Sequence, residues 1–184
     1  ALGIYRDVGD RLGEANTLKA IGDVLQFLDQ RSEALSRYDE ALGIYRDVGA
    51  RLGEANTLKA IGDVLQFLDQ RSEALSRYDE ALGIYRDVGA RLGEANTLCG
   101  LGQVQEDPAQ AMASFLQAQE IYQLIGDQYS QGRNLLMFIV QAQMQMGDET
   151  GARRSLDEAE AIGRAIGVEI LCQVAQQIRE QMGE

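Results

Sequence analysis

The sequence predicts an all-α fold, a solenoid of stacked antiparallel helix pairs. Residues 11–50 and 51–90 are identical, so the chain repeats with a period of 40 residues. Each copy contains two stretches in which apolar residues recur three and four positions apart, the spacing of an amphipathic helix. One pair of this length is too short to bury its apolar surface alone. Each pair must therefore pack on the next, and we expect about ten helices in all.

The two helices of a copy differ in their apolar positions. The first, helix A, has an apolar stripe that in the second copy comprises Ala55, Leu58, Ile61, Gly62, Leu65 and Leu68. The stripe of the second, helix B, comprises Ala74, Leu75, Tyr78, Ala81, Leu82, Ile84 and Tyr85. Helix B should end at Gly89, because a residue without Cβ suits the left-handed position after a helix.

Small residues stand where the two helices should meet. Gly62 lies inside helix A, and Ala74 and Ala81 lie on helix B. A glycine inside a helix costs about 1 kcal/mol relative to alanine. Close approach of the two backbones is the simplest compensation, so these residues are predicted to serve packing and not chemistry.

This pattern of large and small residues resembles the tetratricopeptide repeat family. It reads Leu58, Ile61, Gly62, Leu65, Ala74, Tyr78 and Ala81 in the second copy, and Leu18, Ile21, Gly22, Leu25, Ala34, Tyr38 and Ala41 in the first. The period of 40 exceeds the usual length of about 34 residues, and is similar to the longer bacterial and Pins-like variant. The resemblance implies a right-handed superhelix whose concave groove is lined mainly by A helices.

The whole chain is predicted to form one such solenoid. Its expected parts are a half-repeat B helix at 1–10, repeats at 11–50, 51–90, 91–127 and 128–167, and a capping helix at 168–184. From Cys99 the copies diverge: the spacing from Gly102 to Ala111 is three residues shorter than in the earlier copies, which predicts a shortened A–B turn with Pro108 in the first turn of helix B. One residue is added before Ala152.

Composition excludes several classes of function. The net charge of −12, of which residues 99–184 carry −7, argues against nucleic-acid binding. The longest apolar run, Leu135 to Val140, is too short for a membrane span. With no His and only Cys99 and Cys172, neither a metal site nor a cofactor is expected, and the cysteines are predicted to be free thiols in the cytoplasm. Lacking the commonest catalytic base and any nucleophile motif, the chain is not expected to be an enzyme.

The resemblance implies that polar residues of the A helices face the groove. We call those of the first two repeats the polar ladder, which comprises Asn16, Lys19, Asp23, Gln26, Asn56, Lys59, Asp63 and Gln66. The corresponding residues of the third repeat are Asn96, Cys99 and Gln103. Lys59 and Asp63 are four residues apart, so two roles remain open for them: a mutual ion pair or contact with a ligand. Cys99 is interpreted as a small groove or core residue and not as a redox switch, because nothing near it in the sequence would lower the pKa of its thiol.

The predicted function is a scaffold that binds a peptide or helix of a partner protein in the groove. Similar arrays occur as sensor arms of larger bacterial signalling proteins, and a start at "ALGIYRDVG" without Met predicts a fragment of a longer chain. The alternative is a self-associating or engineered stacking module without a groove ligand. An N-terminal helix B that lacks its helix A would leave a face on which a second copy can stack head to tail, giving a homo-oligomer.

Overall fold

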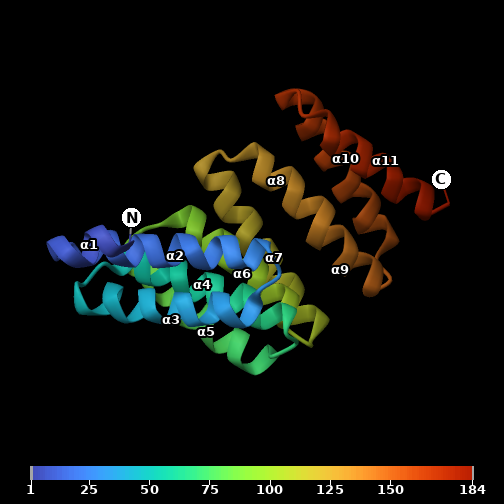
Figure 1. The fold of residues 1–184 in the computed structure, drawn as a ribbon. Helices are drawn as coiled ribbons and strands as arrows, with labels where there is room; N and C mark the ends of the chain where they lie inside the picture. The colour runs from blue at the N-terminus through green and yellow to red at the C-terminus, as the bar shows by residue number, and fades with distance from the viewer. Residues whose placement is uncertain (1, 184) are drawn as a thin grey trace. The chain divides into compact units, whose positions relative to one another are not determined.

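The computed structural model describes residues 2–183, which contain helices and no strand (Figure 1). The all-α prediction is confirmed. The helices are α1 (Leu2–Val8), α2 (Arg11–Phe27), α3 (Arg31–Asp47), α4 (Arg51–Phe67), α5 (Arg71–Asp87), α6 (Arg91–Val104), α7 (Pro108–Ile125), α8 (Gln128–Asn134), the π-helical segment η1 (Leu135–Ile139), α9 (Val140–Gln145), α10 (Glu149–Ile166) and α11 (Glu169–Gln181). The chain divides into two compact units, Ala1–Thr97 and Leu98–Glu184.

In the first unit the duplicated sequence forms consecutive helix pairs. α2 packs against α3, α4 packs against α5, and α3 also packs against α4, which joins one pair to the next. Part of the core is a cluster of Ala15, Leu18, Ala41, Ile44 and Tyr45, drawn from two helices of the first pair. The predicted A and B helices are thus confirmed, and each pair covers the apolar face of its neighbour.

The ends of these helices follow from single residues. The side chain of Asp10 accepts a hydrogen bond from Gly13 N and caps α2, whereas Ala50 offers α4 no such cap. The B helices α3 and α5 end just before Gly49 and Gly89, both with φ of +68°. The predicted end at Gly89 is therefore confirmed, because this left-handed conformation is strained for any residue with a Cβ.

Tyrosine rings account for the glycines inside the A helices. A Cβ at Gly62 would lie 2.7 Å from Cε1 of Tyr78, and one at Gly53 would lie 2.4 Å from Cε1 of Tyr45. Both contacts are shorter than carbon atoms tolerate. The glycines let one ring pack against the A helix of its own pair and the other against the A helix of the next pair.

A buried glutamate holds each of three junctions between a B helix and the following A helix, namely α1–α2, α3–α4 and α5–α6. Glu54 on α4 is only 6% exposed. It accepts hydrogen bonds of 3.0 Å from Arg46 Nε on α3 and 2.7 Å from Arg51 Nη1. Glu14 and Glu94 make the same pair of contacts. A buried carboxylate is costly unless it is paired, and two arginines satisfy this condition.

α6 is shorter than the A helices before it. It has 14 residues, whereas α4 has 17, and residues 105–107 still connect it to α7. The three missing residues therefore come from the end of the helix and not from the turn, which corrects the sequence-based expectation. Pro108 is the first residue of α7 and Asp107 caps it, as predicted.

The extra residue before Ala152 is absorbed inside the next A helix. α8, η1 and α9 form one continuous helix over residues 128–145, one residue longer than α4, and the connection to α10 again has three residues. A π-turn accommodates a single added residue without breaking a helix. The segment "LLMFI" takes this form and buries Leu135, Leu136 and Ile139.

The last two helices, α10 and α11, pack against each other. α11 buries Leu171, Ala175 and Ile178 in a cluster with Leu156 and Ala159 of α10. Its polar residues lie on the exposed side, as the sequence predicts: Gln173, Gln176, Gln177 and Glu180. The limits of the repeats and the capping role of residues 168–184 stay predictions, and residues 1 and 184 lie outside the described part of the chain.

Candidate functional site

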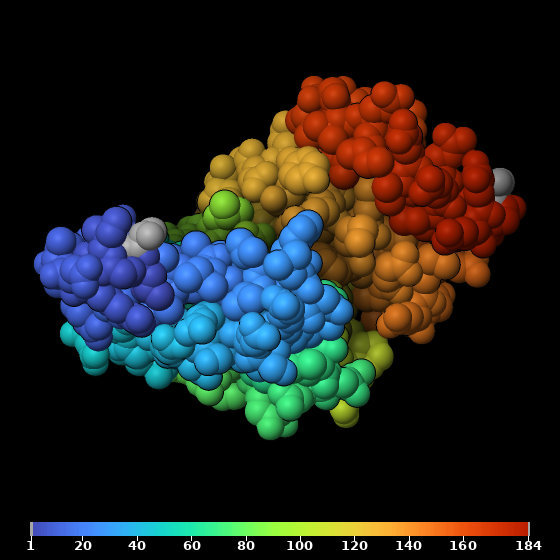
Figure 2. All heavy atoms as spheres, viewed as in Figure 1, coloured from blue at the N-terminus to red at the C-terminus, as the bar shows by residue number. Residues whose placement is uncertain are grey.

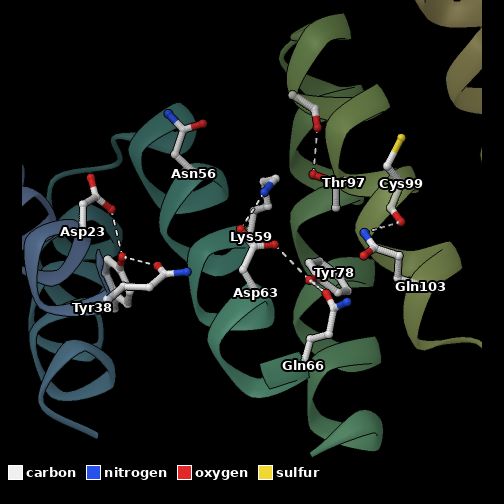
Figure 3. Close-up of polar contacts among 12 residues, drawn as sticks. Asp23, Tyr38, Asn56, Lys59, Asp63, Gln66, Tyr78, Thr97, Cys99 and Gln103 are labelled. Carbon is white, nitrogen blue, oxygen red and sulfur yellow. Dashed lines mark hydrogen bonds and ion pairs between the residues drawn. The ribbon is translucent and has the colours of Figure 1, made fainter. Parts of the chain in front are cut away.

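The predicted polar ladder lies on α2 and α4, within the first unit (Figure 3). A hollow of about 280 Å³ lies there, and eight residues line it: Lys19, Asp23, Gln26, Asn56, Lys59, Ala60, Asp63 and Tyr85. Six of these eight are ladder residues. The remaining ladder residues, Asn16 and Gln66, do not line the hollow but contact tyrosines nearby.

Each lysine of the ladder pairs with the aspartate four residues later. The distance from Nζ to Oδ2 is 2.8 Å for Lys19 and Asp23, and 2.7 Å for Lys59 and Asp63. The ion pair that the spacing allows is therefore made in both copies. Since the pairs are partly exposed, each contributes no more than about 0.5 kcal/mol, and a ligand can compete for either charge at small cost.

Two buried tyrosines hold the aspartates from the B helices (Figure 3). The hydroxyl of Tyr38 lies 2.8 Å from Asp23 Oδ1, and that of Tyr78 lies 2.9 Å from Asp63 Oδ1. The amide oxygen of Gln66 lies 3.0 Å from the Tyr78 hydroxyl as well. A hydroxyl has one proton to donate, and the carboxylate is the stronger acceptor. Each tyrosine therefore fixes an aspartate and brings a glutamine alongside.

A second pair of tyrosines holds the asparagines. The hydroxyl of Tyr45 donates to Asn16 Oδ1, and that of Tyr85 donates to Asn56 Oδ1, both at 2.7 Å. Burial, together with the charge of Asp63, raises the pKa of Tyr85 to about 12. The hydroxyl thus stays protonated at neutral pH and occupies the oxygen of the asparagine. Both asparagines are exposed, and the tyrosine contact engages only the amide oxygen of each.

The corresponding residues of the third repeat behave differently. Cys99 is 4% exposed, and its thiol donates to Asn134 Oδ1 at 3.3 Å. Of the two roles open for Cys99, burial favours the core. Gln103 is exposed, and its Nε2 donates to the carbonyl oxygen of Cys99 at 3.2 Å. Asn96 is half-buried on α6 in the first unit. Both cysteines carry free thiols, as predicted, and Cys172 is half-buried.

The ladder's tyrosine partners were missed by sequence reasoning, which assigned them to the core alone. Their rings are core residues, but their hydroxyls reach the polar face. The signal that could have found them is periodic. Tyr38 and Tyr45 recur as Tyr78 and Tyr85, and each tyrosine lies at the same sequence distance from its ladder residue in both repeats. A tyrosine that is buried usually needs a hydrogen-bond partner, and the ladder supplies it.

The site offers hydrogen bonds and paired charges. No group of three or more His, Cys, Asp or Glu residues capable of holding a metal ion occurs among residues 2–183. In the same part of the chain, no helix is long and apolar enough to cross a membrane.

Comparison with known proteins matches residues 53–124 to the tetratricopeptide repeat family. No curated protein sequence matches the chain. Aspartyl phosphate phosphatase F from Bacillus subtilis has a similar structure, with a TM-score of 0.84 at 15% identity over 90% of this chain and 44% of its own. A second similar structure is a Rap conjugation gene regulator of the plasmid pLS20 in complex with the Phr* peptide. Its TM-score is 0.75 at 16% identity, over 90% of this chain and 46% of its own.

A third similar structure is a Signal Transduction ATPase with Numerous Domains from Pyrococcus horikoshii, described as having a tetratricopeptide repeat sensor. Its TM-score is 0.77 at 18% identity, over 95% of this chain and 26% of its own. At such identities the likeness shows the fold alone. This chain spans less than half the length of each of the three proteins.

Proposed function

Because the chain carries tetratricopeptide repeats, we propose that it is a protein-interaction scaffold that binds a peptide or helix of a partner protein at the polar ladder. The observation that carries the proposal is the hollow between α2 and α4, whose lining is mostly ladder residues. Copies of the same donors and acceptors, one repeat apart, suit a ligand that extends along the repeats.

The tyrosine contacts support this role, because they prepare the polar side chains for binding. A side chain that is already ordered loses less conformational entropy when a ligand arrives. Tyr85 holds Asn56 by its oxygen and leaves the Nδ2 amide to donate to a carbonyl group of the partner. Lys59 and Asp63 neutralise each other, so the ladder suits polar, uncharged backbone groups better than a strongly charged ligand.

The similar proteins add two finer parts to the proposal. One of them is described in complex with a peptide, and another as having a repeat sensor within an ATPase of many domains. On this basis we propose that the chain acts as the sensor arm of a larger bacterial signalling protein in the cytoplasm.

The experiment that tests ladder binding begins with a phage-displayed library of twelve-residue peptides selected on the protein. Selected peptides are then measured against the double variant Asn16→Asp with Asn56→Asp. This change keeps an oxygen acceptor for each tyrosine but removes the two exposed Nδ2 donors. We expect binding to weaken about tenfold or more, since each lost hydrogen bond contributes roughly 1 kcal/mol.

The matched control places the same two negative charges away from the ladder. Ser36 and Ser76 are exposed counterparts on α3 and α5, and Ser36→Asp with Ser76→Asp should leave affinity nearly unchanged. Peptides that bind the ladder variant as tightly as the original protein would refute the ladder as the binding site.

A second candidate function, self-association, is favoured by α1. No residue of α1 is buried, and Ile4 and Val8 are 66% and 70% exposed. The space-filling view shows the side chains of this helix at the surface of its unit (Figure 2). If a second copy stacks there, molar mass measured by light scattering should rise with concentration and fall in the variant Ile4→Glu with Val8→Glu. A mass independent of concentration would exclude this function.

A further inference from the structure

A second hollow, of about 250 Å³, lies in the unit Leu98–Glu184, and we call it the amide hollow. The last turns of α6 and α9 and the first turn of α7 border it, and the residues that matter here are Gln103, Gln105, Glu106, Pro108, Phe115, Phe138, Gln141 and Gln145. The rings of Phe115 and Phe138 stack with centroids 5.2 Å apart and planes at 14°. The hollow thus combines an aromatic surface with four side-chain amides.

The charge distribution of the amide hollow favours a cation. Glu106 is the single ionisable side chain among its lining residues, and it is acidic. The helices α6 and α9 both end here without a basic residue in the last turn. Carbonyl groups at the end of a helix carry partial negative charge and attract positive groups. The opposite charge at the start of α7 is offset by its cap, Asp107.

The duplicated repeats place an arginine at the corresponding position. Arg31 is the first residue of α3, as Pro108 is of α7. In a hollow of about 330 Å³ in the first unit, lined also by Asp23 and Gln26, the Arg31 guanidinium carbon lies 5.1 Å from the centroid of the Phe67 ring. The chain therefore fills this position with its own guanidinium in the first repeat, whereas Pro108 supplies no cation in the third.

We propose that the amide hollow binds an arginine side chain of a partner protein. The proposal rests on the proposed scaffold function for the nature of the partner. The guanidinium stacks on the ring of Phe138, and its N–H groups donate to the side-chain oxygens of Gln141 and Gln145 and to the carboxylate of Glu106. Arginine fits better than lysine, because its planar, weakly hydrated group stacks on aromatic rings and donates several hydrogen bonds in one plane.

The test is an NMR titration of the whole chain, following the side-chain amide signals of Gln141 and Gln145. The probe is the peptide acetyl-Gly-Gly-Arg-Gly-Gly-amide, compared with peptides that carry lysine, norleucine or glutamate in place of arginine. We expect saturable shifts with arginine, binding about tenfold weaker with lysine, and none with norleucine or glutamate. No shift with the arginine peptide, or equal binding of norleucine, would overturn the proposal.

Two variants locate the binding. Pro108→Arg restores the residue type of the earlier repeats and should abolish binding of the probe, because a tethered cation then competes for the hollow. Glu106→Gln should weaken binding about tenfold, whereas Glu120→Gln, an exposed position on α7 outside the hollow, should not. Equal affinities for all three variants and the original protein would overturn the proposal.

This experiment separates the failure of the two proposals. Asn16→Asp with Asn56→Asp should leave the affinity of the probe unchanged, which separates its binding site from the polar ladder. Arginine binding that persists when no peptide is selected at the ladder would overturn the ladder proposal alone. If peptides are selected at the ladder but the arginine probe gives no response, only the proposal for the amide hollow would be overturned.

Discussion

The hydroxyl of Tyr85 on α5 donates a hydrogen bond of 2.7 Å to Asn56 Oδ1 on α4. The ring of the same tyrosine covers Gly93 on α6, where an added Cβ would lie 2.3 Å from Tyr85 Cε1. One side chain thus joins three consecutive helices and also orients a residue of the polar ladder. Stability and binding are coupled at this point, since the ring serves the core and the hydroxyl serves the site.

Stability should fall at alkaline pH through this tyrosine. Burial, and next the charge of Asp63, raises the pKa of Tyr85 to about 12, whereas an unfolded tyrosine titrates near pH 10. The contribution of Tyr85 is therefore complete below about pH 10 and is lost as pH rises through about 12. In Tyr85→Phe the decline of unfolding free energy across this window should be shallower, by up to about 1.4 kcal/mol per pH unit. Urea denaturation of both proteins at pH 8–12 measures the free energy of unfolding at each pH.

The same substitution at Tyr129, which is exposed on α8, provides the control for removing a phenol. If Tyr85→Phe keeps the slope of the original protein between pH 10 and 12, the hydroxyl is not the group responsible.

Glycine substitutions should have opposite effects at two kinds of helical position. An alanine at Gly53 would place its Cβ 2.4 Å from Cε1 of Tyr45, a buried ring that cannot move aside because its hydroxyl is bonded to Asn16. Overpacking of this kind costs about 1–3 kcal/mol. Gly83 has nothing within 4 Å of an added Cβ, so Gly83→Ala should gain up to about 1 kcal/mol of helix propensity. Equal effects in chemical denaturation would contradict the ring packing.

The identical repeats provide a direct test of helix capping. Asp10 caps α2 by accepting a hydrogen bond of 2.8 Å from Gly13 N, and Ala50 stands at the same place before α4. Ala50→Asp should raise the free energy of unfolding by about 0.5–2 kcal/mol, and Asp10→Ala should lower it by a similar amount. Thermal or urea denaturation measures both, and a loss of stability in Ala50→Asp would show that the two junctions differ.

Acid should weaken the repeat junction at Glu94. Burial raises the pKa of this carboxyl, but hydrogen bonds from Arg86 and Arg91 at 2.8 and 2.9 Å outweigh it, and the net pKa is lowered. The contribution to stability is therefore complete above the unfolded pKa near 4.5 and is lost as pH falls through the lower folded value. Glu94→Gln should reduce stability at pH 7 and flatten its decline below pH 4.5.

The control for Glu94 is Glu33→Gln, at an exposed position on α3. A decline below pH 4.5 that is as steep in Glu94→Gln as in the original protein would assign acid sensitivity to other carboxyl groups.

The helical pairs were predictable because the evidence for them is local and repeated. Spacing of Leu58, Ile61 and Leu65 sets the buried face of α4, and all three are buried. The polar ladder was placed correctly on the A helices for the same reason. Its role in binding stays a prediction, as does the division of the chain into repeats, because no ligand contact follows from periodicity.

Contacts across helices were not predictable in the same way. One partner of Glu54, Arg46, lies eight residues earlier, on the preceding helix, and Asn56, the partner of the Tyr85 hydroxyl, lies 29 residues earlier. Both depend on how two helices meet, which a stripe of apolar residues does not specify. The three residues missing from α6 were likewise assigned to the turn, because spacing alone does not distinguish a shorter turn from a shorter helix.

The sequence by itself determined the all-α class, the helix pairs and most of the residues that each helix buries, because helical periodicity fixes which side chains share a face. Leu68, expected in the apolar stripe of helix A, is an exception, because it follows the end of α4 and is exposed. Only the tertiary structure decided which polar atoms meet. It buried Cys99 against Asn134, gave the hydroxyl of Tyr85 to Asn56, and absorbed an added residue in the π-turn at Leu135–Ile139. The first two depend on the distance between helices, which packing of whole faces sets, and the third depends on the backbone of a single helix.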